Sequence, residues 1–155
     1  MKVRTYKVNY YDVTENPTGS TYNALIQTLC DHSDSFYFIT RAEFKYDEAV
    51  LAQFAPHVLE SYKTQKWETT TITGKAATAY VIEANADTCA LLQQHASSLY
   101  DWVAPKLPED LTFTKNDFHW FTCCTHEKFA LFSIRSAHYE QIMLNVDGLS
   151  VEKRD

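Results

Sequence analysis

The chain has 155 residues, with 14 Lys and Arg against 20 Asp and Glu, and a formal net charge of −6. This length suits a single globular domain over 1–155 with a sizeable core. The basic residues are scattered, which argues against nucleic acid, whose phosphates need clustered Lys and Arg, and against an anionic membrane surface.

Short sequence signals narrow the class of protein further. No apolar run approaches the roughly 18 residues of a membrane span, and no apolar signal core follows the N-terminus. We therefore expect a cytoplasmic protein whose four cysteines are thiols. The three glycines form neither of the two Gly-rich phosphate-binding patterns, so we expect no cofactor.

In the first half of the chain, segments whose apolar residues recur every two positions, as in strands, alternate with segments whose apolar residues recur every three to four positions, as in helices. A continuous apolar run (SFYFITR) predicts a central strand covered on both faces. Ser20 or Thr21 is the expected cap of the first helix, and the second is capped by Asp47 or begins just before it. In chain order we expect a strand over 2–13, a helix over 22–30, a strand over 35–41, a helix over 46–54, an irregular edge strand over 58–67 and a strand over 75–83.

The second half predicts a long helix and then a meander. The helix begins at Asn85 or Asp87 and stops before Pro105, and its apolar face is formed by Cys89, Leu92, Ala96, Leu99 and Val103. Strands follow over 111–114, 118–125 and 129–134, with turns at 115–117 and 126–128, a helix from Ser136 to Leu144 and a polar, frayed tail from Asp147. The sum predicts an α+β fold, with helices packed on one face of a mostly antiparallel sheet and a C-terminal three-stranded meander.

Residues 107–132 (LPEDLTFTKNDFHWFTCCTHEKFALF) carry the densest chemistry. Because residues two apart on a strand share a face, the expected strand 118–125 divides its side chains into two sets. Trp120, Thr122, Cys124 and His126 form one set, and His119, Phe121, Cys123 and Thr125 form the other. Either set is a reasonable core face, so the alternation leaves both assignments open.

Metal binding is disfavoured in this segment. Cys124 and His126 supply two potential ligands where a structural zinc site takes about four. His126 and Glu127 also open like a zinc-protease motif, but Ala130 stands where its second His is required. We therefore expect no metal.

Two functional interpretations remain. The leading one is a non-enzymatic domain that binds a protein partner or a small polar ligand through the meander surface, in a pocket formed by Asp110, Trp120, His126 and Glu127; a homodimer is compatible with it. The alternative is a small hydrolase or thiol-dependent enzyme, in which Cys124 is activated by His126 with Glu127 or Asp110. The sequence offers no positioned third group or oxyanion-hole motif for that enzyme.

One resemblance covers residues 36–132. The order FYFITR, a lone Trp67, SLYDWVAPKLPEDLTF, WF and HE resembles a group of small proteins of Gram-positive bacteria. Some members carry the label stage III sporulation protein AH by transferred annotation, a label that normally denotes a membrane-anchored ring component. This chain lacks a membrane segment, so that role is not carried over. The resemblance implies a stand-alone cytoplasmic domain of unknown function, with no catalytic residues to map.

Overall fold

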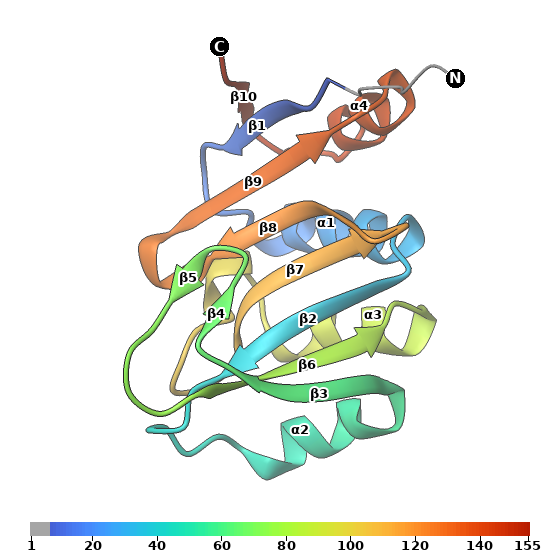
Figure 1. Ribbon diagram of the computed structural model, residues 1–155. Helices are drawn as coiled ribbons and strands as arrows, with labels where there is room; N and C mark the ends of the chain where they lie inside the picture. The colour runs from blue at the N-terminus through green and yellow to red at the C-terminus, as the bar shows by residue number, and fades with distance from the viewer. Residues whose placement is uncertain (1–6) are drawn as a thin grey trace, which may run out of the picture.

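The computed structural model describes residues 7–155, and Figure 1 shows its elements. Helices marked η are short 3-10 helices. In chain order the elements are β1 (Asn9–Val13), α1 (Gly19–Asp31), β2 (Ser35–Thr40), α2 (Glu48–Phe54), η1 (Ala55–His57), β3 (Val58–Thr64), β4 (Lys66–Trp67), β5 (Thr70–Thr71), β6 (Ala77–Glu83), α3 (Ala86–His95), η2 (Leu99–Asp101), β7 (Glu109–Lys115), β8 (Phe118–Cys124), η3 (Thr125–Glu127), β9 (Phe129–Ile134), α4 (Ala137–Leu144) and β10 (Val151–Lys153).

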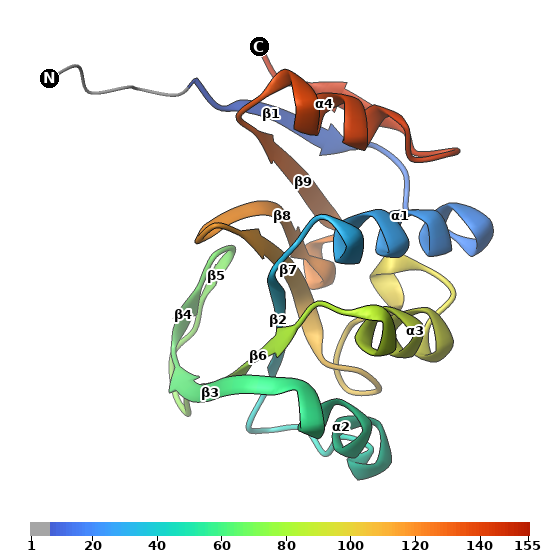
Figure 2. The ribbon, with the colours of Figure 1, turned by 90° about the vertical axis from the view of Figure 1, so that its right-hand side faces the viewer.

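Eight strands form one sheet in the order β10-β1-β9-β8-β7-β2-β6-β3. Every pair in this sheet is antiparallel. Figure 2 shows the helices on one face of the sheet and the β4–β5 hairpin on the other. The predicted α+β fold and its C-terminal meander, β7-β8-β9, are therefore confirmed.

The core lies on both sides of β2. Phe36 and Phe38 are buried against the helices, and Phe36 packs on Phe113 with ring centroids 5.2 Å apart. Tyr37 and Ile39 are buried under the hairpin together with Trp67. A strand with one apolar row on each face needs cover on both, which is why the continuous run over 35–41 marks the centre of the sheet.

Several predicted boundaries are confirmed by local chemistry. Asp47 caps α2 by accepting a hydrogen bond from Ala49 N, and Ser136 caps α4 by accepting one from Tyr139 N. Asn85 caps α3 in a reciprocal pair with Thr88. In each case a short polar side chain satisfies a backbone N–H that the first helical turn leaves free.

The first helix begins earlier than predicted. Its N-cap is Thr18, not Ser20 or Thr21, because Thr18 pairs with Ser98 in an isolated bridge and Gly19 N donates to Ser97 O. This contact with a distant loop fixes the start of the helix. The strand expected over 2–13 begins at Asn9, and positions 2–6 lie outside the described residues.

The long helix predicted up to Pro105 was wrong in its second half. α3 ends at His95, and Ala96 is extended, with φ −146° and ψ 155°. The Asp101 carboxylate accepts hydrogen bonds from Ser97 N and Ser98 N, so it starts the new turn η2 instead of prolonging the helix. Leu99 remains fully buried, which explains why the apolar spacing looked continuous.

The tail predicted to be frayed from Asp147 is instead paired. Val151–Lys153 forms β10, an edge strand antiparallel to β1. Arg154 continues the contact, since its side chain holds Asp12 through two bonds of 2.7 and 2.8 Å. Val146 is buried in the main core, which ties this segment down.

Candidate functional site

A β-bulge in β8 decides which side chains face the site. Phe113 pairs with Phe121, but Thr114 pairs with His119, so Trp120 is an additional residue on β8. A bulge of this kind interrupts strict alternation. Phe121, Cys123 and Trp120 all lie in the core under the helices. The prediction that Trp120 lies on the opposite face of the strand from Phe121 and Cys123 was therefore wrong.

Trp120 consequently packs in the core and does not face the open side of the sheet. It is 2% exposed, its indole Nε1 donates to Ser33 Oγ at 2.9 Å, and its ring centroid lies 5.0 Å from that of Tyr139. These contacts are on the helical side of the sheet, whereas the open side carries Thr122 and Cys124. The predicted pocket that grouped Trp120 with His126 and Glu127 is therefore not formed.

The β4–β5 hairpin lies against the open side and is anchored there by Trp67. The indole Nε1 of Trp67 donates to Asp110 Oδ2 at 2.8 Å, and the Arg41 guanidinium carbon lies 5.1 Å from its ring centroid. Beside it, Glu68 N donates to Tyr37 OH at 3.1 Å. Burial raises the pKa of Tyr37 to about 12, so this hydroxyl is neutral at physiological pH.

Asp110, a predicted ligand-binding residue, lies beneath the hairpin. It is 1% exposed, and its Oδ1 accepts hydrogen bonds from Thr125 N at 2.9 Å and Thr125 Oγ1 at 3.1 Å. With the indole of Trp67 on Oδ2, both carboxylate oxygens are engaged. Asp110 is therefore a support for the site and not a contact surface within it.

Glu109 and Arg41 extend this buried polar cluster. Arg41 Nη2 lies 3.1 Å from Glu109 Oε2, and the Glu109 side chain is 4% exposed. Burial, followed by the neighbouring Asp110 charge, raises the pKa of Glu109 above its ordinary value even though Arg41 opposes the shift. Arg41 Nε is buried without a hydrogen-bond partner among the described residues.

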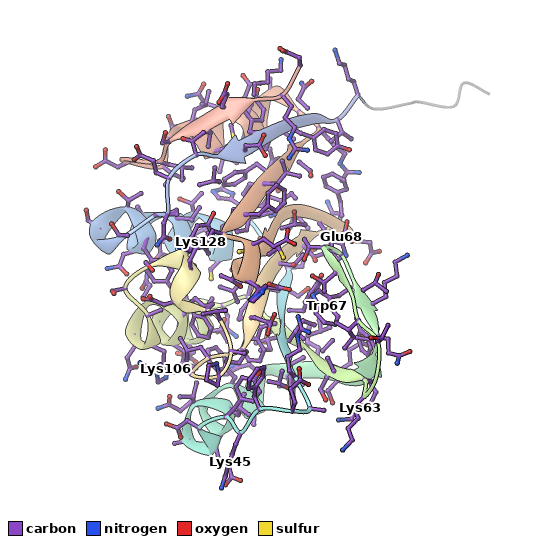
Figure 3. All side chains as sticks on the ribbon, turned by 90° about the vertical axis from the view of Figure 1, so that its left-hand side faces the viewer. Lys45, Lys63, Trp67, Glu68, Lys106 and Lys128 are labelled. Carbon is purple, nitrogen blue, oxygen red and sulfur yellow. The ribbon has the colours of Figure 1, made fainter. Side chains whose placement is uncertain are left out.

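The hairpin forms one wall of a hollow that we call the open-face groove. Its volume is about 480 Å³, and it runs over β8 and β9 towards β1. Figure 3 shows the hairpin beside the sheet, with Trp67 and Glu68 labelled. The groove is lined by Tyr10, Glu68, Thr69, Asp117, Phe118, His119, Thr122, Cys124, Glu127, Phe129, Leu131 and Ser133.

The charged groups of the groove are mostly acidic. Glu68, Asp117 and Glu127 contribute carboxylates, and His119 is the one basic side chain that residues 7–155 place in the lining. His119 Nε2 lies 3.8 Å from Glu68 Oε2, and its Nδ1 lies 2.7 Å from Thr114 Oγ1. The groove therefore presents negative charge beside aromatic rings.

The residues predicted for thiol chemistry are only partly brought together. Cys124 and Glu127 line the groove, whereas His126 is exposed on η3 and is not part of the lining. Among residues 7–155, the hydrogen-bond contact of the Cys124 thiol is with Thr70 Oγ1 at 3.8 Å. Cys123 is fully buried, and burial raises the pKa of its thiol well above the ordinary range.

A metal-binding cluster and a membrane-spanning helix are both absent from the described part of the chain. Within residues 7–155, no group of three or more His, Cys, Asp and Glu side chains is arranged to hold a metal ion. In the same range, no helix combines the length and the apolar character that crossing a membrane would require.

Comparisons with protein families, with curated proteins and with solved structures gave no match. The resemblance to the Gram-positive group therefore stays a prediction.

Sequence reasoning found Glu127 and missed most of the groove. His119 was assigned to the face opposite Cys124, because the bulge at Trp120 cannot be seen in a pattern of period two. Glu68 was missed because residues 58–67 were interpreted as one irregular strand. The signal present there is the Thr-rich stretch 69–71, which forms the return of the small hairpin.

Proposed function

We propose that the protein is a non-enzymatic binding protein that holds its ligand in the open-face groove. The observation that carries this proposal is the groove itself. Its volume of about 480 Å³ lies in the range of about 300–1,000 Å³ that small-ligand sites occupy. It combines apolar rings with a few polar groups, which is the usual composition of a binding site.

The rigidity of the groove wall supports binding. The hairpin strands β4 and β5 have two residues each, too few to hold a fixed position alone. The buried bond from Trp67 to Asp110 and the contact of Glu68 N with Tyr37 hold the hairpin on the sheet. A wall fixed before the ligand arrives reduces the ordering cost of binding.

Binding is favoured over thiol catalysis by the surroundings of Cys124. A nucleophilic thiol needs a base or a positive field beside it. The Cys124 thiol contacts the neutral hydroxyl of Thr70, and the groove around it carries three carboxylates.

The test is a fragment screen of 15N-labelled protein, read by the amide shifts of assigned residues. We expect binding fragments to shift amides of β8, β9 and the hairpin. Leu131→Trp, which fills the floor of the groove, should abolish these shifts. Leu144→Trp is the matched control, since Leu144 is exposed on α4 and outside the groove lining.

Thermal unfolding of both variants confirms that they are folded before binding is compared. Fragment shifts that cluster on another surface would refute the proposal. So would shifts at the groove that persist in folded Leu131→Trp.

A further inference from the structure

We infer that the occupant of the open-face groove is an extended segment of a partner protein, basic at both ends and apolar or small between them. This inference rests on the proposed function and names the ligand class. Three features of the groove support it: the sign of its charge, the spacing of its carboxylates and the character of its middle.

The charge of the lining is the first feature. Among residues 7–155, it contains Glu68, Asp117 and Glu127 but neither Lys nor Arg. The whole chain has a net charge of −6, so the long-range field favours approach of a cation as well. An anionic ligand would meet the three carboxylates of the lining, and such like-charge contacts are unfavourable.

Two arginines of the chain already lie over rings of the groove rim, so the carboxylates are the groups left for a cationic ligand. The Arg154 guanidinium carbon lies 5.7 Å from the ring centroid of Phe129, and that of Arg135 lies 3.8 Å from the centroid of Phe118. The ring faces attract cations electrostatically. The charge of Arg154 is balanced by its two bonds to Asp12.

The spacing of the carboxylates selects an extended segment. Asp117 immediately precedes β8 and Glu127 follows it on η3. The seven residues of β8 span roughly 23 Å at about 3.3 Å per residue. A small amine reaches one of these ends, whereas an extended peptide of about seven residues has the same rise and reaches both.

The middle of the groove is uncharged. Between the acidic ends lie Thr122, Cys124 and Leu131. Charged side chains placed there would lose hydration without gaining a partner. Small or apolar residues in the middle of the segment fit this floor, with the basic side chains reserved for the ends.

The test uses a capped heptapeptide, arginine-lysine-leucine-threonine-leucine-lysine-arginine, measured by calorimetry and by amide shifts. Two other peptides keep its leucine-threonine-leucine middle. In one, glutamate and aspartate replace the basic residues at both ends, and in the other glutamine replaces them. The free triamine spermidine serves as the small-cation probe. We expect the basic peptide to bind and its Kd to rise about tenfold or more between about 25 and 300 mM salt, because exposed ion pairs are screened.

Charge-removing variants locate the effect. Combining Glu68→Gln, Asp117→Asn and Glu127→Gln should weaken binding of the basic peptide about tenfold or more. A control variant removes three exposed carboxylates that do not line the groove, by Glu43→Gln, Glu60→Gln and Asp147→Asn. It has the same net charge and should change Kd by less than about twofold.

The alternative results are distinguishable. Equal groove binding by the neutral or acidic peptide would overturn this inference and leave the proposed function intact. Spermidine binding as tightly as the peptide would assign the groove to a small amine. Groove shifts that appear on raising the protein concentration alone would assign it to a second copy, and either result overturns the partner segment. If neither peptides nor fragments shift groove amides, the proposed function itself fails.

Discussion

The indole of Trp67 donates a 2.8 Å hydrogen bond to Asp110 across 43 positions of sequence. This bond fixes a hairpin of two-residue strands against the open face of the sheet and thereby forms a wall of the groove. Trp67 is 7% exposed and Asp110 is 1% exposed, so the bond is shielded from water. Its loss would leave the indole N–H of Trp67 and the Oδ2 atom of Asp110 buried without a partner.

Replacing Asp110 tests this anchor. We expect Asp110→Ala to lower the free energy of unfolding, measured with urea, by about 3 kcal/mol more than Asp117→Ala. The reason is that Trp67 Nε1 and Thr125 N lose their acceptor, at about 1–3 kcal/mol for each buried unpaired group. Asp117 is the matched control because its φ of 60° is close to the 62° of Asp110, so the backbone cost of alanine is shared. Equal effects of the two substitutions would show that the buried bonds contribute nothing.

Replacing Trp120 tests the face assignment produced by the bulge. Trp120→Phe removes the bond to Ser33 and leaves a small cavity, so we expect a loss of about 2 kcal/mol in the free energy of unfolding. Ligand shifts in the groove should be unchanged in the folded variant, because Trp120 lies on the other side of the sheet. A folded Trp120→Phe with altered groove binding would contradict the assignment.

The raised pKa of Glu109 predicts a pH effect on stability. Its ordinary value is 4.5, and burial raises the pKa in the folded protein. The folded state therefore binds this proton more tightly than the unfolded state does. The resulting stability is fully present below the ordinary pKa and is lost as the pH rises through the raised pKa. As the pH rises through the range from the ordinary to the raised pKa, the free energy of unfolding of the wild-type protein should fall relative to that of Glu109→Gln. Urea titrations at a series of pH values check this, and a constant difference between the two proteins would refute it.

The adjacent cysteines should differ in reactivity. Cys123 is fully buried in the core with a raised pKa, whereas Cys124 lines the groove. We expect iodoacetamide to modify Cys124 of the native protein at least about tenfold faster than Cys123, since alkylation requires an accessible thiolate. Mass spectrometry of digested samples measures both rates. Cys124→Ser provides the control for the Cys123 signal, and similar rates at the two positions would contradict the assigned faces.

Local patterns were sufficient to predict much of the fold. The apolar run of β2 indicated a strand covered on both sides, and Phe36 and Tyr37 are indeed buried on opposite faces. Asp47, Asn85 and Ser136 were recognisable as helix caps because capping depends on a few neighbouring residues. These features are local in sequence, so a single chain is enough to reveal them.

The errors arise where other contacts override the apolar periodicity. Thr18 takes the N-cap position of α1 because it pairs with the distant Ser98. α3 stops at His95 for a local reason, since Asp101 accepts hydrogen bonds from the nearby Ser97 and Ser98 and organises a new turn. The bulge at Trp120 lets three residues of β8 enter the core on one side. None of these contacts leaves a periodic signal.

The groove was the least predictable part for the same reason. Its lining comes from β1, the hairpin, the β7–β8 turn, β8, η3 and β9. Glu127 could be proposed because it sits in the reactive segment 107–132. Glu68 and Tyr10 come from segments with no chemical signature, and only the fold brings them into one groove with His119.

The two borders of the sheet carry a consequence for self-assembly. Unpaired edge strands template the addition of further chains and so promote fibrils. At one border, the pairing of β3 is irregular between Val58 and Glu60, and Lys63 adds charge to that strand. At the other, β10 is three residues long and charged at Glu152 and Lys153, and it covers the longer edge of β1. Removal of β10 would leave β1 as the unpaired border strand and give the chain a route to ordered aggregation.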